Sequence, residues 1–162
     1  MAAEARDETR DVVALWRLLS SYADVVTRRA WSELTDLFVA DASIEVDTVT
    51  AAPRHFDRPA ALGEFIGAAL ERFDHFEFVI LNRVFDFDPT DPDVARGRVF
   101  MSEIRREKAT GEWSTTYGLY QDSYRRSEGR WWFADRHYRS LARTGSNEGA
   151  FGLPDGLEPF DR

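Results

Sequence analysis

The chain contains no cysteine, which excludes disulfide bonds, thiolate catalysis and cysteine-ligated zinc and fits a reducing compartment. No apolar run approaches the roughly 20 residues that span a bilayer. The charged segment of residues 1–10 lacks an apolar core, so we expect no secretion signal there. Basic residues are also in deficit, with 21 Lys and Arg against 29 Asp and Glu and a formal charge of −8. We therefore predict a cytoplasmic protein without nucleic-acid or membrane partners.

Metal-binding patterns are equally scarce. The three histidines, His55, His75 and His137, have no helix-spaced partner of the kind found in zinc enzymes. The acidic stretch of residues 86–93 lacks the central glycine and terminal glutamate of a calcium loop, and Pro and Asp there favour a turn. No glycine-rich phosphate loop or Gly-x-Ser-x-Gly elbow is present. The sequence predicts no metal site.

Aromatic residues are abundant, at 14% of the 162 residues, with twelve Phe, five Trp and five Tyr. A chain of this length is expected to form a single domain with a substantial core. Such aromatic side chains can fill that core or line an apolar cavity, and composition does not choose between the two. We place the domain at residues 1–145 and a Gly- and Pro-rich tail at residues 146–162.

Hydrophobic periodicity predicts helices first and strands afterwards. Apolar residues recur at helical spacing over residues 7–28, then in a short helix within residues 30–42, and again over residues 56–73, where Asp57 is a candidate N-cap. A short strand is expected at residues 43–49. The period changes to two in four further segments, which predicts strands at about 76–87, 94–106, 112–126 and 130–142. This order is typical of an α+β domain with helices packed on one face of a bent sheet.

The last two strands carry polar residues on a face that is expected to point inward. If residues 127–129 form a three-residue loop, Tyr120 lies opposite Arg136, with Asp122 and Tyr138 diagonal to them. A two-residue turn would shift the register by one and break this grouping. The grouping has two interpretations: a solvated face with an ion pair, or the polar floor of a mostly apolar pocket.

Two segments carry a resemblance to a known family. Residues 22–46, "YADVVTRRAWSELTDLFVADASIEV", and residues 117–141, "YGLYQDSYRRSEGRWWFADRHYRSL", resemble motifs of the SnoaL-like branch of the nuclear transport factor 2-like superfamily, in particular its scytalone dehydratase-like members. The similarity extends over about residues 8–142. It implies a cone-shaped α+β fold in which three N-terminal helices pack on a strongly curved mixed or antiparallel sheet and leave a deep pocket.

The resemblance implies function less sharply than fold. Family members include dehydratases, isomerases and cyclases that use acid–base chemistry on hydrophobic rings without a cofactor, and also non-catalytic carriers and subunits. We therefore expect a cofactor-free lyase, isomerase or cyclase for a small hydrophobic ring compound. The alternative is a non-catalytic binding or accessory module. A homodimer formed through the exposed sheet face is also expected from the resemblance.

The site residues that the resemblance implies fall into two groups. Asp24 or His75 is expected to abstract a proton, and Tyr120 with Arg136 to stabilise a developing oxyanion. The alignment leaves open whether Phe78 replaces His75 at the family's histidine position. The residues expected to line the substrate pocket are Tyr22, Thr27, Val46, Gly118, Asp122 and Tyr138. Thr27 and Val46 stand where scytalone dehydratase-like members have an acidic residue and a tyrosine, so that enzyme's mechanism does not transfer.

Overall fold

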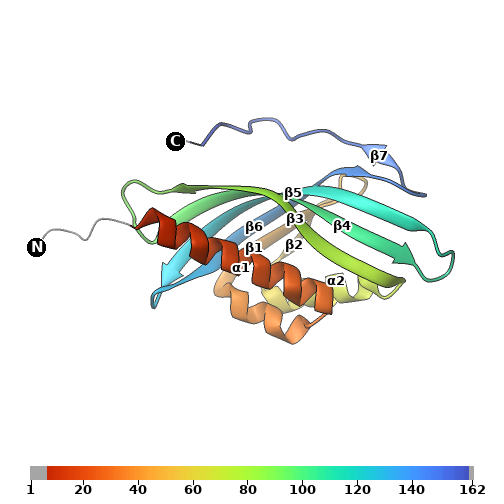
Figure 1. Cartoon of the computed structure of the whole chain (residues 1–162), viewed down its shortest axis with the longest axis horizontal. Coiled ribbons are helices and arrows are strands. Elements are labelled where there is room, and N and C mark those ends of the chain that lie inside the picture. The colour runs from red at the N-terminus through yellow and green to blue at the C-terminus, as the bar shows by residue number, and fades with distance from the viewer. Residues whose placement is uncertain (1–6, 161–162) are drawn as a thin grey trace, which may run out of the picture.

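A computed structural model of the chain describes residues 7–160. Residues 1–6, which belong to the segment expected not to be a secretion signal, lie outside the described part. Helices α1 (Glu8–Arg28), η1 (Trp31–Leu37) and α2 (Pro59–Leu70) pack on one face of a curved sheet (Figure 1). Over residues 7–160 no helix is long and apolar enough to cross a membrane.

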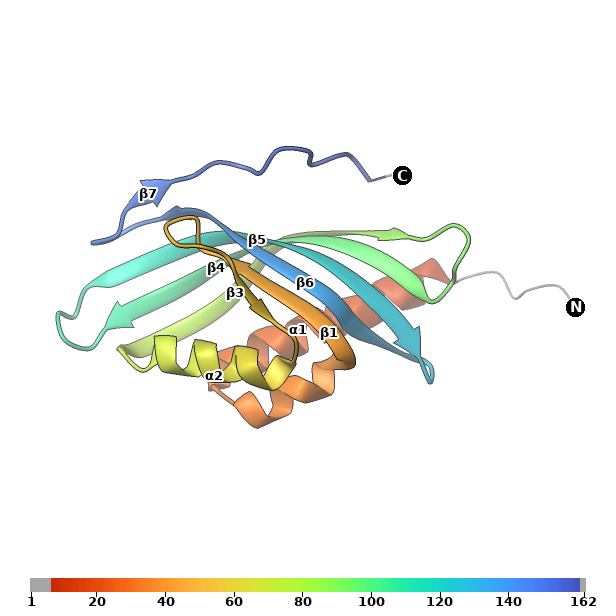
Figure 2. The same cartoon turned by 180° about the vertical axis from the view of Figure 1, so that it is seen from behind.

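The sheet is mixed and open. Its strands are β1 (Phe38–Asp47), β2 (Arg54–Phe56), β3 (Phe73–Phe87), β4 (Val94–Glu107), β5 (Trp113–Ser127), β6 (Arg130–Arg143) and β7 (Gly149–Ala150). They follow the order β2-β1-β6-β5-β4-β3, with β7 added to β6. Within residues 7–160 only the β1–β6 pair is parallel, so the chain must cross the sheet once, and the helices lie on the side of that crossing (Figure 2). The result is the nuclear transport factor 2-like α+β fold that the sequence predicts.

The helices match the periodicity, with two differences. Asp7 caps α1, since its carboxylate accepts a hydrogen bond from the backbone N–H of Arg10 at 3.1 Å. The short second helix is a 3-10 helix, and the strand after it begins at Phe38 rather than at residue 43. The third helix is shorter than predicted, because its N-cap is Arg58 and β3 already begins at Phe73. Asp57 is therefore not the cap.

The last hairpin differs from the expected loop but keeps the expected face. Ser127 pairs with Arg130, so the loop contains only Glu128 and Gly129, both with positive φ, at 53° and 73°. A bulge between Ser123 and Tyr124 then shifts the register by one residue. The short turn and the bulge each shift the pairing by one residue in the same direction. The total shift of two residues keeps the predicted polar residues on one face.

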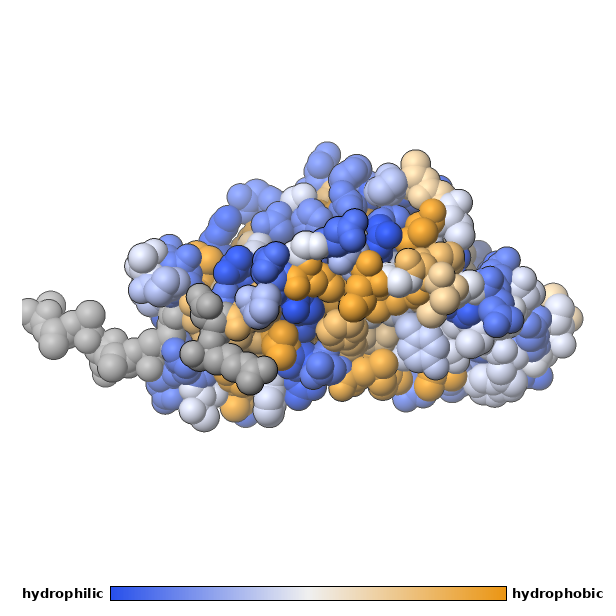
Figure 3. All heavy atoms as spheres, turned by 90° about the horizontal axis from the view of Figure 1, so that it is seen from above, coloured by the Kyte–Doolittle hydropathy of each residue, from blue (hydrophilic) through white to orange (hydrophobic). Residues whose placement is uncertain are grey.

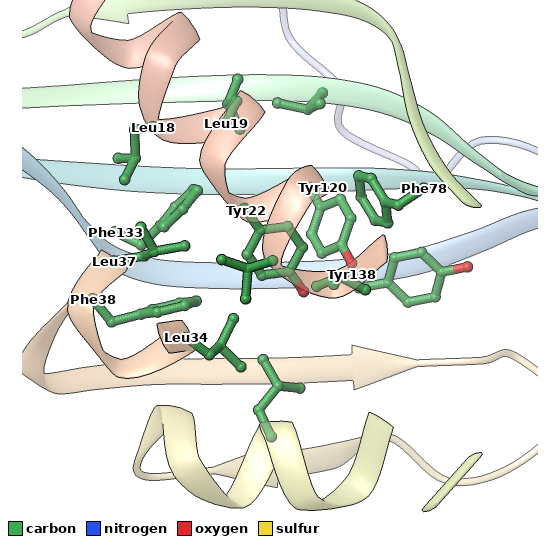
Figure 4. Packing of buried hydrophobic residues seen from close by; sticks show 14 of the residues in the cluster. Leu18, Leu19, Tyr22, Leu34, Leu37, Phe38, Phe78, Tyr120, Phe133 and Tyr138 are labelled. Carbon is green, nitrogen blue, oxygen red and sulfur yellow. The ribbon is translucent and has the colours of Figure 1, made fainter. Parts of the chain in front are cut away.

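The paired residues are not the ones that the longer loop implied. Tyr120 lies opposite Tyr138, and Asp122 lies opposite Arg136. All four of these side chains are buried, which rules out the solvated-face interpretation. These side chains lie against the hydrophobic core beneath α1 and η1. Figure 4 shows Tyr22 of α1, Tyr120 of β5 and Phe133 of β6 packed together there.

The tail is not entirely loop, because Gly149 and Ala150 pair with β6 and residues 151–160 then run across the outer face of the sheet (Figures 1 and 2). Arg98 on that face donates to the carbonyl oxygen of Glu158 at 2.6 Å and lies 4.8 Å from the ring centroid of Phe160. Seen from above, this side shows orange and blue side chains side by side (Figure 3). The segment therefore crosses the face predicted to form a homodimer, and the dimer stays a prediction.

Candidate active site

A cavity of about 300 Å³ lies between the concave face of the sheet and the helices. Helix α1 contributes Tyr22 and Val26, and helix α2 contributes Leu62, Phe65 and Ile66. The strands contribute aromatic and charged side chains, so the lining is apolar on the helix side and more polar on the sheet side. A volume of this size is typical of small-molecule sites.

Aromatic rings enclose the inner end of the cavity. The rings of Tyr22, Phe78 and Tyr120 contact one another, with the Tyr22 centroid 5.5 Å from Phe78 and 6.1 Å from Tyr120, and Tyr138 lies 5.1 Å from Tyr120 (Figure 4). The guanidinium of Arg136 stacks among these rings, at 4.0 Å from Tyr22 and 3.8 Å from Tyr120. Such contacts stabilise a cation where water is excluded.

Arg136 is paired with a buried carboxylate, that of Asp122, on the side away from the cavity. Its Nε lies 3.3 Å from Oδ1 of Asp122, and both side chains are at most 1% exposed. Tyr124 donates its hydroxyl to the other carboxylate oxygen at 2.9 Å. Burial raises the pKa of Asp122 to about 6, although the charge of Arg136 and the Tyr124 hydrogen bond act in the opposite direction. Asp122 lies behind Arg136 and is not among the residues that line the cavity.

The outer end of the cavity carries an acid between two arginines. Glu103 on β4 is 23% exposed, and its Oε2 lies 3.5 Å from Nη1 of Arg105. Burial raises the pKa of Glu103 above its ordinary value, and the positive charges of Arg105 and Arg143 only partly offset this. A carboxyl group in such a setting exchanges protons closer to neutral pH than a solvated one.

A hydrogen-bonded chain joins the outer and inner ends. Nη2 of Arg143 donates to the hydroxyl of Ser140 at 3.1 Å, and that hydroxyl also lies 3.1 Å from the hydroxyl of Tyr138. The pKa of Tyr138 is raised, first by burial and then by the negative charge of Glu103. Tyr138 therefore remains a neutral hydroxyl group whose pKa responds to the charge of Glu103.

Strand register explains why these residues meet. Glu103 on β4 lies opposite Thr116 on β5, which in turn lies opposite Arg143 on β6. In the next rows of the same face, Gly118 pairs with Ser140 and Tyr120 with Tyr138. Because side chains on one face recur every second residue, these rows place Glu103, Thr116 and Arg143 together at the outer end of the inward face.

The sequence analysis predicted part of this lining. Tyr22, Val46, Tyr120, Arg136 and Tyr138 do line the cavity. Gly118 does not, because it makes room for the ring of Tyr138: a Cβ there would lie 2.3 Å from that ring. A glycine is required at this point by close packing.

The residues predicted to abstract a proton are elsewhere. Asp24 is 61% exposed and binds Arg28 on the surface of α1, with 2.8 Å between Oδ2 and Nε. His75 is 45% exposed on β3 and packs against the ring of Trp113. The structure brings neither side chain to the cavity, where Phe78 occupies the strand position that the alignment left open.

Thr27 also has a different position from the one expected. Its hydroxyl accepts a hydrogen bond from the backbone N–H of Phe78 at 3.0 Å, which ties α1 to β3. It is not among the residues that line the cavity. The helix position that is acidic in scytalone dehydratase-like members therefore supplies a structural contact here.

Glu103, Arg105 and Arg143 were missed by the sequence analysis. A signal was present, since Val99, Met101, Glu103 and Arg105 alternate along β4 and the first two are fully buried. Strand alternation places the charged pair on the same face as the buried pair. Among residues 7–160 no group of three or more histidine or carboxylate side chains could hold a metal ion.

The chain belongs to a known family. The model of the SnoaL-like domain matches residues 7–137, which is most of the sequence. Comparison with curated proteins gave no match. The domain's fold and its pocket between sheet and helices agree with this assignment.

Solved structures share the fold at low identity. A candidate scytalone dehydratase from Novosphingobium aromaticivorans DSM 12444 is 20% identical, with a TM-score of 0.76 over 94% of this chain and 97% of that one. A hexachlorocyclohexane dehydrochlorinase, LinA type 2, is 16% identical, with a TM-score of 0.74 over 93% and 98%. LinA type 3 from Novosphingobium barchaimii LL02 is 17% identical, with a TM-score of 0.71 over 91% and 98%. At these identities the likeness establishes the fold alone.

Proposed function

We propose that the protein catalyses cofactor-free proton transfer on a small hydrophobic ring compound, as a lyase, isomerase or cyclase. One observation carries the proposal: Glu103, a carboxyl group with a raised pKa, lines an aromatic cavity that also contains the buried cation of Arg136. The solved relatives described as a scytalone dehydratase and as dehydrochlorinases support the same class of chemistry. Glu103 replaces Asp24 and His75 as the proposed base.

The proposed reaction uses the two ends of the cavity differently. A ring ketone packs its apolar body against Tyr22 and Phe78, with the carbonyl oxygen toward Tyr120 and Arg136. Glu103 removes a proton from the carbon beside the carbonyl. The C–H electron pair forms a double bond to the carbonyl carbon, the carbonyl π pair moves onto the oxygen, and the resulting enolate oxygen is stabilised by the Tyr120 hydroxyl and the Arg136 charge. Returning the proton elsewhere gives isomerisation, and loss of a leaving group gives elimination.

The test is hydrogen–deuterium exchange of a neutral ring ketone, 2-tetralone, followed by NMR in deuterated buffer. We expect the protein to accelerate exchange beside the carbonyl, and Glu103→Gln to reduce that acceleration by about 10²–10⁴-fold, the usual contribution of general acid–base catalysis. Glu77→Gln is the matched control, because Glu77 lies on β3 with a 52% exposed side chain and does not line the cavity.

Two further variants distinguish Glu103 from Asp24 and His75, the candidates for the base that the sequence analysis named. Asp24→Asn and His75→Asn are expected to exchange at the wild-type rate. Loss of exchange in either one, with Glu103→Gln unaffected, would overturn the assignment of Glu103. If the wild-type protein did not accelerate exchange, the proposal of enzymatic proton transfer on ring ketones would be contradicted.

A second candidate function is ligand binding without catalysis. Thr27, at the family position expected to carry an acid, does not ionise near neutral pH, which favours this candidate. Binding of ring compounds without any exchange beside the carbonyl would support it.

A further inference from the structure

Arg143 differs from most other arginines of the sheet. Arg139 binds Asp47 at 2.6 Å and Arg126 binds Asp11 at 3.0 Å. Arg143 instead binds neutral oxygens: the carbonyl of Thr48 at 2.6 Å, the hydroxyl of Ser140 at 3.1 Å and that of Thr50 at 3.3 Å. Among the described residues no carboxylate forms an ion pair with Arg143. In a chain with 29 acidic and 21 basic residues, an unpaired guanidinium in a cavity is unexpected.

Arg143 is held in place from both sides. Its backbone pairs with Gly149 of β7, and its guanidinium carbon lies 5.4 Å from the ring centroid of Phe151. With its donors to Thr48 and Ser140, the side chain is tied to the loop after β1, to β6 and to the tail. Because the Arg143 side chain is already ordered, ligand binding costs little additional side-chain conformational entropy.

The whole lining has the opposite charge balance from the protein. Four arginines line the cavity, Arg72, Arg105, Arg136 and Arg143, against two acids, Glu45 and Glu103. Arg72 pairs with Glu107 at 2.6 Å and Arg136 with Asp122 at 3.3 Å, two acids outside the lining, so Arg105 and Arg143 are the arginines left for a ligand. Two such guanidinium groups at one end of a cavity concentrate a positive field on an incoming anion.

Arg105 is also incompletely paired. Its only ion pair among the described residues is the 3.5 Å contact with Glu103, and its Nε is buried without a hydrogen-bond partner. Arg105 borders a second, more polar hollow of about 370 Å³, which is lined by Thr110, Ser114 and Asn147 among others. The charged end of the cavity is therefore the end that continues toward this hollow.

From these contacts we propose that the ligand of the cavity is a hydrophobic ring compound bearing a carboxylate or a similar single anion. The anion binds Arg143 and Arg105 at the outer end, while the ring occupies the aromatic inner end. Guanidinium groups suit this task because their planar donors match a carboxylate. This inference rests on the proposed function, whose site it shares, and it adds the charge of the substrate.

The test measures binding of two probes with the same ring, 2-naphthoate and the neutral 2-naphthamide, by isothermal titration calorimetry at pH 8. We expect wild-type protein to bind the acid at least tenfold more tightly than the amide, since hydrogen bonds to charged groups are the stronger ones. Arg143→Gln should lose most of that preference and leave the amide affinity within about twofold. Arg125→Gln, which removes the same charge from an exposed site on β5, is the matched control.

Glu103→Gln gives an independent readout. Removing the acid beside Arg105 takes away a like charge, so naphthoate should bind this variant more tightly than wild type, with the amide unchanged. This result does not depend on whether Arg143→Gln folds, which circular dichroism and thermal melting check first. A residue with a purely structural part in the cavity would shift both probes together.

Several outcomes would overturn the inference. Equal affinity of the wild type for acid and amide, an undiminished preference in folded Arg143→Gln, or no binding of either probe at millimolar concentration would each do so. Exchange of 2-tetralone that depends on Glu103 would leave the proposed function standing in all three cases. Loss of that exchange, with the acid preference intact, would instead leave an anion-binding site without the proposed catalysis.

Discussion

An acid and an arginine are paired at each end of the cavity, behind its lining at the inner end and within it at the outer end, and the two pairs differ in structure. At the inner end, Asp122 and Arg136 are at most 1% exposed and are surrounded by rings and the Tyr124 hydroxyl. At the outer end, Glu103 and Arg105 are 23% and 19% exposed, and their contact is longer, at 3.5 Å. Burial raises the pKa of both acids. The inner pair fixes a cation in place, and the outer pair leaves an acid that a ligand can reach.

The largest effect is expected from removing Asp122, the acid paired with Arg136 at the inner end. Asp122→Ala leaves Arg136 buried without a counter-charge and the Tyr124 hydroxyl without its acceptor. We expect the free energy of unfolding at pH 7 to fall by about 3–5 kcal/mol, as for other broken buried pairs. Urea denaturation followed by circular dichroism measures this. A loss below about 1 kcal/mol would show that Asp122 does not hold Arg136 in place.

A smaller effect is expected in the pH dependence of stability, which reports the raised pKa of Asp122. The pKa of Asp122 is about 6 in the folded protein, against 3.8 for an unperturbed aspartate, so the folded state binds the proton more tightly. Its contribution to stability is therefore present below about pH 4 and is lost as the pH rises through about 6.

Comparing wild type with Asp122→Asn isolates this contribution from the other acids. The free energy of unfolding of the wild type, relative to the variant, should fall by about 2 kcal/mol between pH 4 and pH 7. Urea denaturation at intervals across that range gives the difference. A difference that stays constant with pH, or rises, would contradict the raised pKa.

The smallest expected effect is at the outer end. Glu103→Gln replaces an acid whose ionised form is already disfavoured in the folded protein, so at pH 8 its free energy of unfolding should stay within about 1 kcal/mol of the wild-type value. The same denaturation experiment checks it. A loss as large as that of Asp122→Ala would mean that both ends are structural, and the contrast between them would disappear.

The hairpin shows how far pattern reasoning can go. The sequence analysis paired Tyr120 with Arg136, whereas the structure pairs Tyr120 with Tyr138 and Asp122 with Arg136. The face was nevertheless predicted correctly, because a shift of two residues restores the same alternation. The bulge at Ser123 and Tyr124 that completes this shift has no clear sequence signature.

Asp24 and Glu103 show where local reasoning fails. Asp24 shares a helical face with Thr27, but its partner Arg28 is one turn away and holds it at the surface. Glu103 looks like an ordinary charged residue in a polar strand end. Strand alternation can place it on the inward face, but its position across Thr116 from Arg143 depends on three strands and two registers, which no local pattern encodes.

Local patterns were enough to predict the order of helices and strands, the family, and the inward face of the last two strands, because periodicity and motifs are local properties of the chain. The folded structure was needed to show which charged groups line the cavity together and which arginines lack an acidic partner. Both depend on contacts between residues far apart in sequence and on how completely each group is removed from water. Burial and charge partners are set by the assembled sheet and helices, so the chemistry of the site could be read only after folding.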